Sequence, residues 1–397
     1  MGKSDTPVQC LYVHVPFCAH KCEYCAFYSE VANASAVDRY VAALVRELEM
    51  AAADLQPRTV FFGGGTPSLL SVRHWDLILQ AMARLNLLGA TEWTIECNPA
   101  TVSADKARLW REAGVNRVSL GIQSFSDVLL QRLGRIHSRA EALASFDLLR
   151  RAGFDNLNLD LMFGIPGQTL ADWQATLQEA LALESEHLSS YEVTYEDDTP
   201  LFAQLQAGEF SVDEDLLAAM FEELIATAET RGFGQYEISN FARHLPARQT
   251  VGLPGLPSQA CQHNVNYWRG GPYHGLGPSA HSFVGDLRYK NWANIPRYCS
   301  LLEQGQRPVE SEDPLPLLAR AGEIAGIGLR LSTGWRFDEF QAVTGCDLRQ
   351  EWAEPMQRLV QQGWASRDAD HFQLTRQGLR FADAAAAEFI EVERPPF

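Results

Sequence analysis

Short apolar runs alternate with amphipathic stretches between residues 8 and 240. Val37, Tyr40, Val41, Leu44 and Leu48 recur at the spacing of one helical face, which predicts a helix between the first two runs. The apolar runs are short and rich in β-branched and aromatic residues, which is typical of strands. We predict strands over residues 11–15, 59–62, 93–97, 117–121, 156–162 and 188–193.

Six strands separated by helices indicate an α/β domain. This count favours a partial (β/α)6 barrel over a doubly wound sheet, although periodicity alone does not separate the two. In both folds, functional residues gather at the C-terminal ends of the parallel strands. We therefore divide the chain into a core barrel (residues 8–240), a connecting segment (241–309) and a C-terminal domain (310–397).

The C-terminal domain is predicted to be mostly helical and winged-helix-like. Residues 315–331 and 348–362 have helical patterns, residues 364–367 and 371–374 a hairpin pattern, and residues 375–389 that of a terminal helix. Winged helices often bind DNA, but residues 310–397 hold 9 Arg, no Lys and 15 acidic residues, a net charge of −6. We expect this domain to cover the active site or to contact a partner, without nucleic acid.

Composition narrows the function classes further. Of 397 residues, 46% are apolar, enough for a large core, and the formal charge is −17. An acidic surface disfavours nucleic acid and anionic lipid as partners. No apolar run approaches the roughly 20 residues of a membrane span, and residues 1–5 precede a strand pattern where a signal peptide would have an apolar core. We expect a cytoplasmic protein. Residues 244–260 form a Pro/Gly-rich loop to which we assign no chemistry.

Three of the eight cysteines follow the first strand at the spacing Cys18-x3-Cys22-x2-Cys25. At this chain's cysteine frequency the spacing would arise by chance about 0.003 times. Structural zinc with His14 or His20 as a fourth ligand, or a disulfide with one spare thiol, is conceivable. A [4Fe-4S] cluster with three thiolate ligands and one open iron is favoured, since Phe27 occupies the place of a fourth cysteine.

The motif, with an aromatic residue at Tyr24, resembles the signature of radical S-adenosylmethionine (SAM) enzymes. In that superfamily the open iron chelates SAM, and reduction of the cluster cleaves SAM to a 5′-deoxyadenosyl radical. The string Tyr12-Val13-His14-Val15-Pro16-Phe17-Cys18 is similar to the oxygen-independent coproporphyrinogen III oxidase family, which contains true oxidases and haem chaperones (the HemW branch). Residues 326–331 and 374–378 resemble that family's C-terminal domain. The resemblance implies a radical SAM partial (β/α)6 barrel.

Further residues match family positions that contact SAM. A glycine turn after a strand offers backbone N–H groups and close approach, and Gly64, Gly65 and Thr66 resemble the family's loop over the SAM amino group. The structural alternatives to SAM binding are a helix-cap contact for Glu96 and a barrel-floor salt bridge for Asp160 and Arg135. The resemblance implies SAM binding by Tyr12, Tyr24, Gly64, Gly65, Thr66, Glu96, Gln123, Arg135 and Asp160.

The string His263-Asn264-Val265-Asn266-Tyr267-Trp268 matches the H-N-x-x-Y-W motif of the haem-chaperone branch. His263 is the predicted haem ligand, with His274 and His281 as rivals, because imidazole is a standard axial ligand. Phe27 and the absence of the oxidase's N-terminal extension before Cys18 also favour that branch. The resemblance implies a haem chaperone that passes haem to an acceptor protein and has an electron donor for its cluster. Peripheral contact with a membrane-bound acceptor is left open. The alternative is a radical SAM enzyme acting on a porphyrin.

Overall fold

The structure is a computed structural model that describes residues 6–245 and 253–390. In this part of the chain, nine strands form the main sheet in the order β11-β1-β4-β5-β6-β7-β8-β10-β9. The six central strands are parallel and follow chain order, whereas a doubly wound sheet would reverse its order at a switch point. The predicted partial barrel is confirmed. Its strands are β1 (Val8–Val15), β4 (Leu55–Gly64), β5 (Glu92–Cys97), β6 (Arg117–Gln123), β7 (Leu157–Phe163) and β8 (His187–Glu192).

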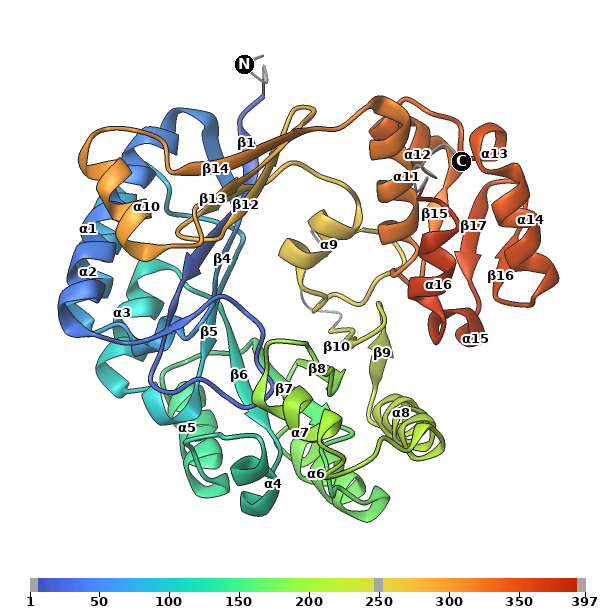
Figure 1. Ribbon diagram of the computed structural model, residues 1–397, viewed down its shortest axis with the longest axis horizontal. Coiled ribbons are helices and arrows are strands. Elements are labelled where there is room, and N and C mark those ends of the chain that lie inside the picture. Colours follow the sequence, from blue (N-terminus) through green and yellow to red (C-terminus); the bar gives the residue numbers. More distant parts are fainter. Residues whose placement is uncertain (1–5, 246–252, 391–397) are drawn as a thin grey trace.

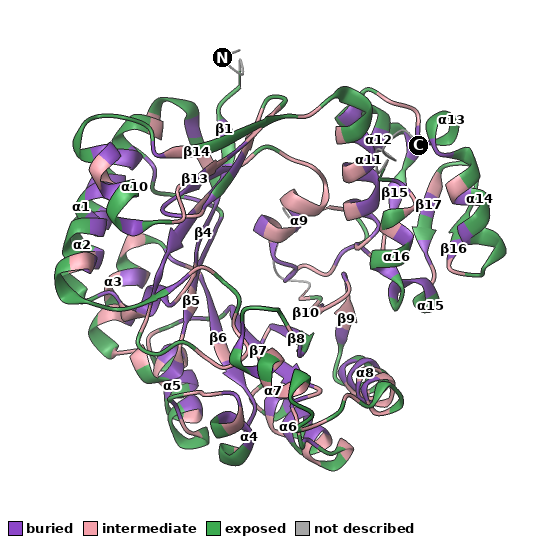
Figure 2. Ribbon diagram, viewed as in Figure 1, coloured by how far each residue is buried: buried purple, intermediate pink, exposed green. Residues whose placement is uncertain are grey.

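Helices cover the outer face of this sheet (Figure 1). Each turns an apolar stripe inward, as Figure 2 shows by its purple inner surfaces; α2, for example, buries Trp75, Ile78 and Met82. Polar caps start many of the helices; in one of them, Thr169 and Asp172 bond reciprocally. The helices are α1 (Ala34–Ala51), α2 (Val72–Arg84), α3 (Ala104–Ala113), α4 (Asp127–Arg132), α5 (Arg139–Arg151), α6 (Leu170–Ala182), α7 (Pro200–Gln206) and α8 (Glu214–Thr230).

The sheet is extended at both edges by strands that we did not predict. β11 (His274–Leu276) runs parallel to β1. On the other edge, β10 (Asn240–Arg243) pairs antiparallel with β8, and β9 (Phe233–Gln235) pairs antiparallel with β10. These strands have only three or four residues, too few for their periodicity to stand out in the sequence.

The connecting segment contains α9 (Gln262–Trp268), α10 (Ile295–Glu303) and a second antiparallel sheet of β12 (His281–Val284), β13 (Leu287–Asn291) and β14 (Val309–Pro314). A buried carboxylate, Glu47 of α1, fixes this segment to the barrel. It accepts hydrogen bonds from the Gly277 N–H (2.8 Å), Asn291 (2.6 Å) and the Tyr298 hydroxyl (2.5 Å). Part of the Pro/Gly-rich loop, residues 246–252, lies outside the described residues.

The C-terminal unit has its own apolar core and the expected winged-helix-like elements. The predicted helix over 348–362 is two helices, separated at Trp352, whose indole N–H donates to the Phe389 carbonyl (3.0 Å). The predicted terminal helix is also divided. The elements are α11 (Leu317–Gly328), β15 (Trp335–Arg336), α12 (Phe337–Thr344), α13 (Leu348–Glu351), α14 (Ala353–Gln361), β16 (Ala365–Arg367), β17 (His371–Leu374), α15 (Arg376–Leu379) and α16 (Ala382–Ala387).

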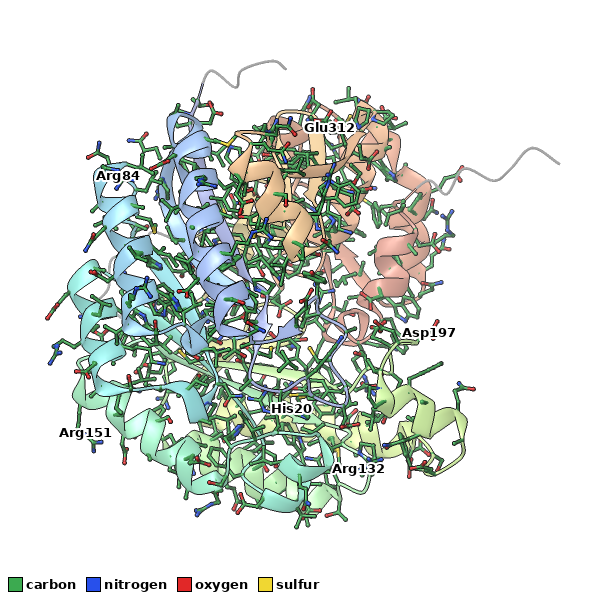
Figure 3. All side chains as sticks on the ribbon, turned by 60° about the vertical axis from the view of Figure 1, so that its left-hand side comes forward. His20, Arg84, Arg132, Arg151, Asp197 and Glu312 are labelled. Atoms are coloured by element: carbon green, nitrogen blue, oxygen red, sulfur yellow. The ribbon has the colours of Figure 1, made fainter. Side chains whose placement is uncertain are left out.

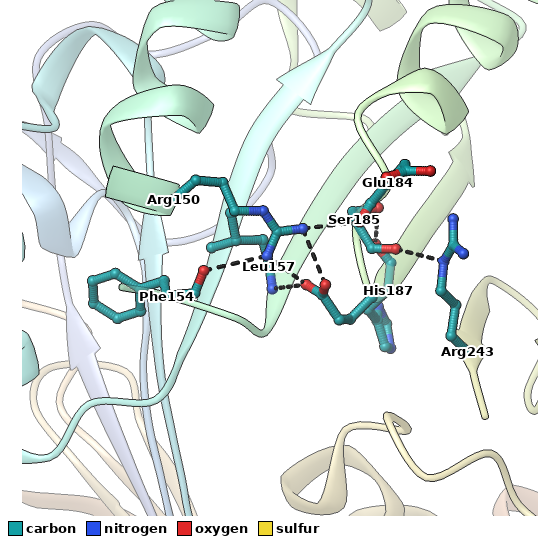
Figure 4. Close-up of polar contacts among 8 residues, drawn as sticks. Arg150, Phe154, Leu157, Glu184, Ser185, His187 and Arg243 are labelled. Carbon is teal, nitrogen blue, oxygen red and sulfur yellow. Dashed lines mark hydrogen bonds and ion pairs between the residues drawn. The ribbon is translucent and has the colours of Figure 1, made fainter. Parts of the chain in front are cut away.

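The N-terminal ends of β7 and β8 are joined by a closed polar network (Figure 4). Both guanidinium Nη atoms of Arg150 lie 3.0 Å from carboxylate oxygens of Glu186, and Glu186 also accepts the Leu157 N–H (2.9 Å). Arg150 donates in addition to the carbonyls of Phe154 and Glu184. We call these residues the floor network. No helix among the described residues is long and apolar enough to cross a membrane.

Candidate functional site

The three-cysteine loop leaves β1 at the C-terminal end of the barrel. It starts in β2 (Phe17–Cys18), which pairs with β3 (Glu30–Val31), so the loop closes on itself. Its centre is held by Glu23, whose N–H donates to the Leu133 carbonyl (3.1 Å) and whose carbonyl accepts the Leu201 N–H (3.0 Å). His20 in this loop is exposed (Figure 3). The backbone therefore fixes the loop without help from its thiols.

Two of the three sulfur atoms already face a hydrogen-bond donor. The Thr66 hydroxyl lies 3.5 Å from Cys18 Sγ, and Arg135 Nη1 lies 3.7 Å from Cys22 Sγ. Both contacts place a hydrogen-bond donor against a sulfur atom that would carry negative charge as a metal ligand. Burial, with a smaller contribution from Cys22 and Cys18, raises the pKa of Cys25. Phe27, at the place of a fourth cysteine, is 71% exposed.

The two alternatives to an iron–sulfur cluster receive no support from the geometry. All eight cysteines are free. His14 has both ring nitrogens in contact with other groups, Nδ1 at 3.0 Å from the Tyr12 hydroxyl and Nε2 at 2.9 Å from the Tyr28 carbonyl. Within residues 6–245 and 253–390, no three His, Cys, Asp or Glu side chains are close enough to hold a single metal ion. A tetrahedral zinc ion with Zn–S distances of about 2.3 Å would need its sulfur ligands only about 3.8 Å apart. The described residues provide no group of ligands gathered for one ion in this way.

The glycine turn at the end of β4 is shaped by close contacts. Gly64 has φ of 103°, and a Cβ atom there would lie 2.4 Å from the His14 imidazole; a Cβ on Gly65 would lie 2.7 Å from the Phe17 carbonyl. The N–H groups of Gly64, Gly65 and Thr66 donate to Glu96 (3.1 Å), the Val15 carbonyl (2.8 Å) and the Phe17 carbonyl (2.8 Å). The glycines thus allow the turn to pack closely against His14 and Phe17, and the three N–H donors are already used within the protein.

Glu96 and Asp160 face one polar cavity of about 180 Å³ inside the barrel. Glu96 accepts the Gly64 N–H and not a helix cap, and Asp160 accepts hydrogen bonds from Ser119 (3.0 Å) and Asn158 (2.7 Å). Burial, reinforced by Asp160, raises the pKa of Glu96 to about 8. Burial also raises the pKa of Asp160, against the effect of its hydrogen bonds. Tyr12 lines the same cavity, so three predicted SAM contacts meet there.

Gln123, Arg135 and Tyr24 form the side of the site next to Cys22. Gln123 ends β6 with φ of 65°, a left-handed conformation that is strained for a residue with a side chain. Arg135 donates to the Gly121 carbonyl (2.6 Å) and hydrogen-bonds Tyr24, while its buried Nε has no partner. No ion pair joins Arg135 to Asp160 in the part of the chain that the structure describes, so the predicted alternative salt bridge is absent there.

The candidate haem ligand His263 lies in α9 and is only 1% exposed. Its Nδ1 is 3.0 Å from the Thr59 hydroxyl and 3.3 Å from Cys10 Sγ, and its Nε2 is 2.9 Å from the Tyr267 hydroxyl. Burial, with a contribution from Arg117, lowers the pKa of His263 to about 3. His263 is therefore a neutral imidazole at the wall of the polar cavity.

Several residues of the cavity were not predicted. Polar residues occupy alternate positions of otherwise apolar strands, and alternate residues of a strand point to one face. This period of two, within strands that we had already identified, was the signal that could have found them. The missed residues are Arg117 and Ser119 on β6, Asn158 on β7, and Ser189 and Tyr191 on β8.

Comparison with known proteins agrees with this geometry. Residues 12–180 match the radical SAM superfamily, and residues 315–381 match the HemN C-terminal domain. The chain is 36% identical to the heme chaperone HemW of Escherichia coli, over 97% of this chain and 98% of the relative. It is 32% identical to the HemW of Bacillus subtilis, over 96% and 98% of the two chains.

The chain belongs to the HemW family of radical SAM proteins. The resemblance inferred from the cysteine spacing is thereby confirmed. Superfamily membership implies a [4Fe-4S] cluster and SAM as cofactors. The solved structure of the coproporphyrinogen III oxidase HemN from E. coli has the same fold, with a TM-score of 0.82, 20% identity and coverage of 98% of this chain and 91% of that chain.

Proposed function

We propose that this chain is a haem chaperone that binds haem and transfers it to an acceptor protein, and that a SAM-ligated [4Fe-4S] cluster is held by Cys18, Cys22 and Cys25. The observation that carries the proposal is similarity over nearly the full length to relatives named heme chaperone HemW. An acceptor protein, an electron donor, peripheral contact with a membrane-bound acceptor and a cytoplasmic location are part of the proposal.

The residues around the three thiols fit such a cluster. A cluster with three thiolate ligands supplies one iron with an open coordination position. Thr66 and Arg135 would donate to the sulfurs of Cys18 and Cys22, which offsets the negative charge that three thiolates bring together. The unpartnered Nε of Arg135 leaves one further donor for an anionic ligand group.

The proposed SAM contacts surround this position. Gly64 and Gly65 would allow the amino-acid end of SAM to approach the backbone, and Glu96 and Asp160 would accept hydrogen bonds from hydroxyl or amino groups. The remaining proposed contacts, from the strand ends and the cluster loop, are Tyr12, Tyr24, Thr66, Gln123 and Arg135. The family resemblance predicts His263 as the haem ligand, but both of its ring nitrogens are in contact with other polar groups, Thr59 at 3.0 Å and Tyr267 at 2.9 Å.

The decisive experiment compares binding with turnover. The reconstituted protein is titrated with haem without oxygen and, in a separate sample, incubated with SAM, a reductant and coproporphyrinogen III. We expect one haem per chain and no decarboxylation. Repeated turnover to protoporphyrinogen IX, without haem binding, would contradict the proposal and establish the alternative radical SAM enzyme.

A further inference from the structure

A second cavity, of about 350 Å³, lies beside the polar cavity where the barrel, the small sheet and the C-terminal unit meet. The two cavities share Tyr12 and Tyr267. Its volume falls in the range of about 300–1,000 Å³ that small-molecule sites have. We call it the junction pocket.

The walls of the junction pocket are aromatic and aliphatic. Tyr267 and Tyr273 meet edge to face with ring centroids 4.5 Å apart, and Phe283 continues this wall at 6.5 Å from Tyr273. Ile324 and Ile327 of α11 form the opposite wall. Apolar walls of this kind suit a flat, apolar ring system.

Of the three histidines considered above, His281 is the one that lines this pocket, and it is an exposed residue. Its backbone is held by strand pairing with Lys290 of β13, and it packs so closely on Gly275 that a Cβ atom there would lie 2.0 Å from the His281 carbonyl oxygen. The imidazole hydrogen-bonds the carbonyl of Ser279, a residue in the left-handed region with φ of 65°. Such a bond to one ring nitrogen fixes the tautomer and leaves the lone pair of the other nitrogen for a metal.

His263 and His274 are placed differently. His263 hydrogen-bonds Tyr267, so it positions a wall of the junction pocket without reaching into it. His274 is buried, with Nδ1 at 3.0 Å from the Tyr289 hydroxyl. The H-N-x-x-Y-W motif therefore contributes Tyr267 and Trp268 to the pocket lining, and a histidine behind them.

Two arginines supply positive charge to the pocket. Arg288 is paired with Glu323, and Arg320 is paired with Asp286, which is 78% exposed at its side chain. The Nε of Arg320 is buried and has no hydrogen-bond partner. Because exposed acidic partners bind weakly, a ligand carboxylate can replace Asp286 at little cost. Glu323 also lines the pocket and neutralises Arg288, so Arg320 is the pocket arginine that can meet a ligand carboxylate.

We infer that the junction pocket is the haem site of this chain, with His281 as the axial ligand of the iron, Tyr267 and Phe283 against one side of the macrocycle, and Arg320 on a propionate. This inference rests on the proposed function. The exposure of His281 leaves one edge of a bound haem accessible, as transfer to an acceptor protein requires.

The test is haem titration of the intact, cluster-loaded protein, followed by absorption and electron paramagnetic resonance spectra. We expect His281→Ala to weaken haem binding at least tenfold and to abolish the spectrum of an imidazole-ligated iron. Added imidazole should restore that spectrum in His281→Gly. The matched control is His371→Ala, a half-exposed histidine of the C-terminal unit, which should bind haem like the wild type.

Two further variants test the walls and the charge. Ile327→Trp should fill the pocket and lower haem affinity at least tenfold. The iron and sulfide content of the cluster, measured before haem is added, should not change. Arg320→Gln should weaken haem binding about fivefold but leave the binding of haem dimethyl ester unchanged. The inference would be overturned if His281→Ala bound haem with the affinity and spectra of the wild type. It would also be overturned if the imidazole spectrum were lost in His263→Asn but kept in His281→Ala. A wild-type protein that binds no haem at all would instead overturn the proposed function.

Discussion

The two ends of the barrel use their polar groups in different ways. At the N-terminal ends of β7 and β8, the floor network satisfies Arg150 and Glu186 with each other and with backbone groups. At the C-terminal ends, Arg135 keeps a buried Nε without a partner, and the three thiols of the cluster loop form no disulfide. Groups that are fully satisfied stabilise the fold, whereas unsatisfied groups retain the capacity to bind a ligand. Substitutions at the two ends should therefore separate stability from cofactor content.

The largest effect is expected from Cys22→Ala at the C-terminal end. Loss of one of three thiolates should reduce iron and sulfide to near zero, because two ligands do not retain a cluster. The backbone contacts of Glu23 hold the loop independently, so the far-ultraviolet circular dichroism should not change. Cys346→Ala, outside the cluster loop, is the control. Unfolding together with loss of iron would show that the metal has a structural role.

Gly64→Ala should combine strain with a clash. The new Cβ atom would meet the His14 ring at 2.4 Å, and φ of 103° disfavours any side chain. We expect the free energy of unfolding to fall by about 3 kcal/mol. Gly114→Ala is a matched control, since Gly114 has φ of 102° with nothing within 4 Å of a Cβ atom. It should cost only about 1 kcal/mol, and equal losses in the two variants would contradict the predicted clash. Urea denaturation measures both.

Glu186→Ala tests the opposite end. It removes the partner of Arg150 and the acceptor of the Leu157 N–H, so the free energy of unfolding should fall by about 2 kcal/mol. The iron content after reconstitution should equal that of the wild type. Glu49→Ala, which breaks an exposed pair with Arg84, should cost less than about 0.5 kcal/mol. Loss of iron in Glu186→Ala would contradict the separation between the two ends.

Glu96→Gln should change the pH dependence of stability. Burial raises the pKa of Glu96 to about 8, so the folded state binds a proton that the unfolded state has released above a pH of about 4.5. Stability of the cluster-free protein should therefore decrease as pH rises from about 5 to 8, by at most about 1.4 kcal/mol per pH unit. Glu96→Gln should reduce this slope, as urea denaturation at several pH values would measure. An unchanged slope would show that Glu96 is ionised in the folded protein.

Much of the barrel could be predicted because its signals are local. Each of the six strands lies within a few residues of its predicted range, and the C-x3-C-x2-C spacing occupies eight consecutive residues. The misses have a local cause too. β9 and β11 are three residues long, and Pro355, which has no N–H to donate to the Glu351 carbonyl, divides the helical pattern of residues 348–362 at the end of α13. The partner of the Trp352 indole, the Phe389 carbonyl, lies 37 residues away and is not revealed by a local pattern.

The sequence by itself determined the class of this protein, since alternation of apolar and polar residues sets the strands and three closely spaced thiols set the chemistry. Only the tertiary structure decided which histidine faces which cavity. His263 meets Thr59 and Cys10 across separations of 204 and 253 residues, and this burial distinguishes it from the exposed His281. Burial depends on how all the elements pack together, whereas strand periodicity and motif spacing depend on neighbouring residues alone.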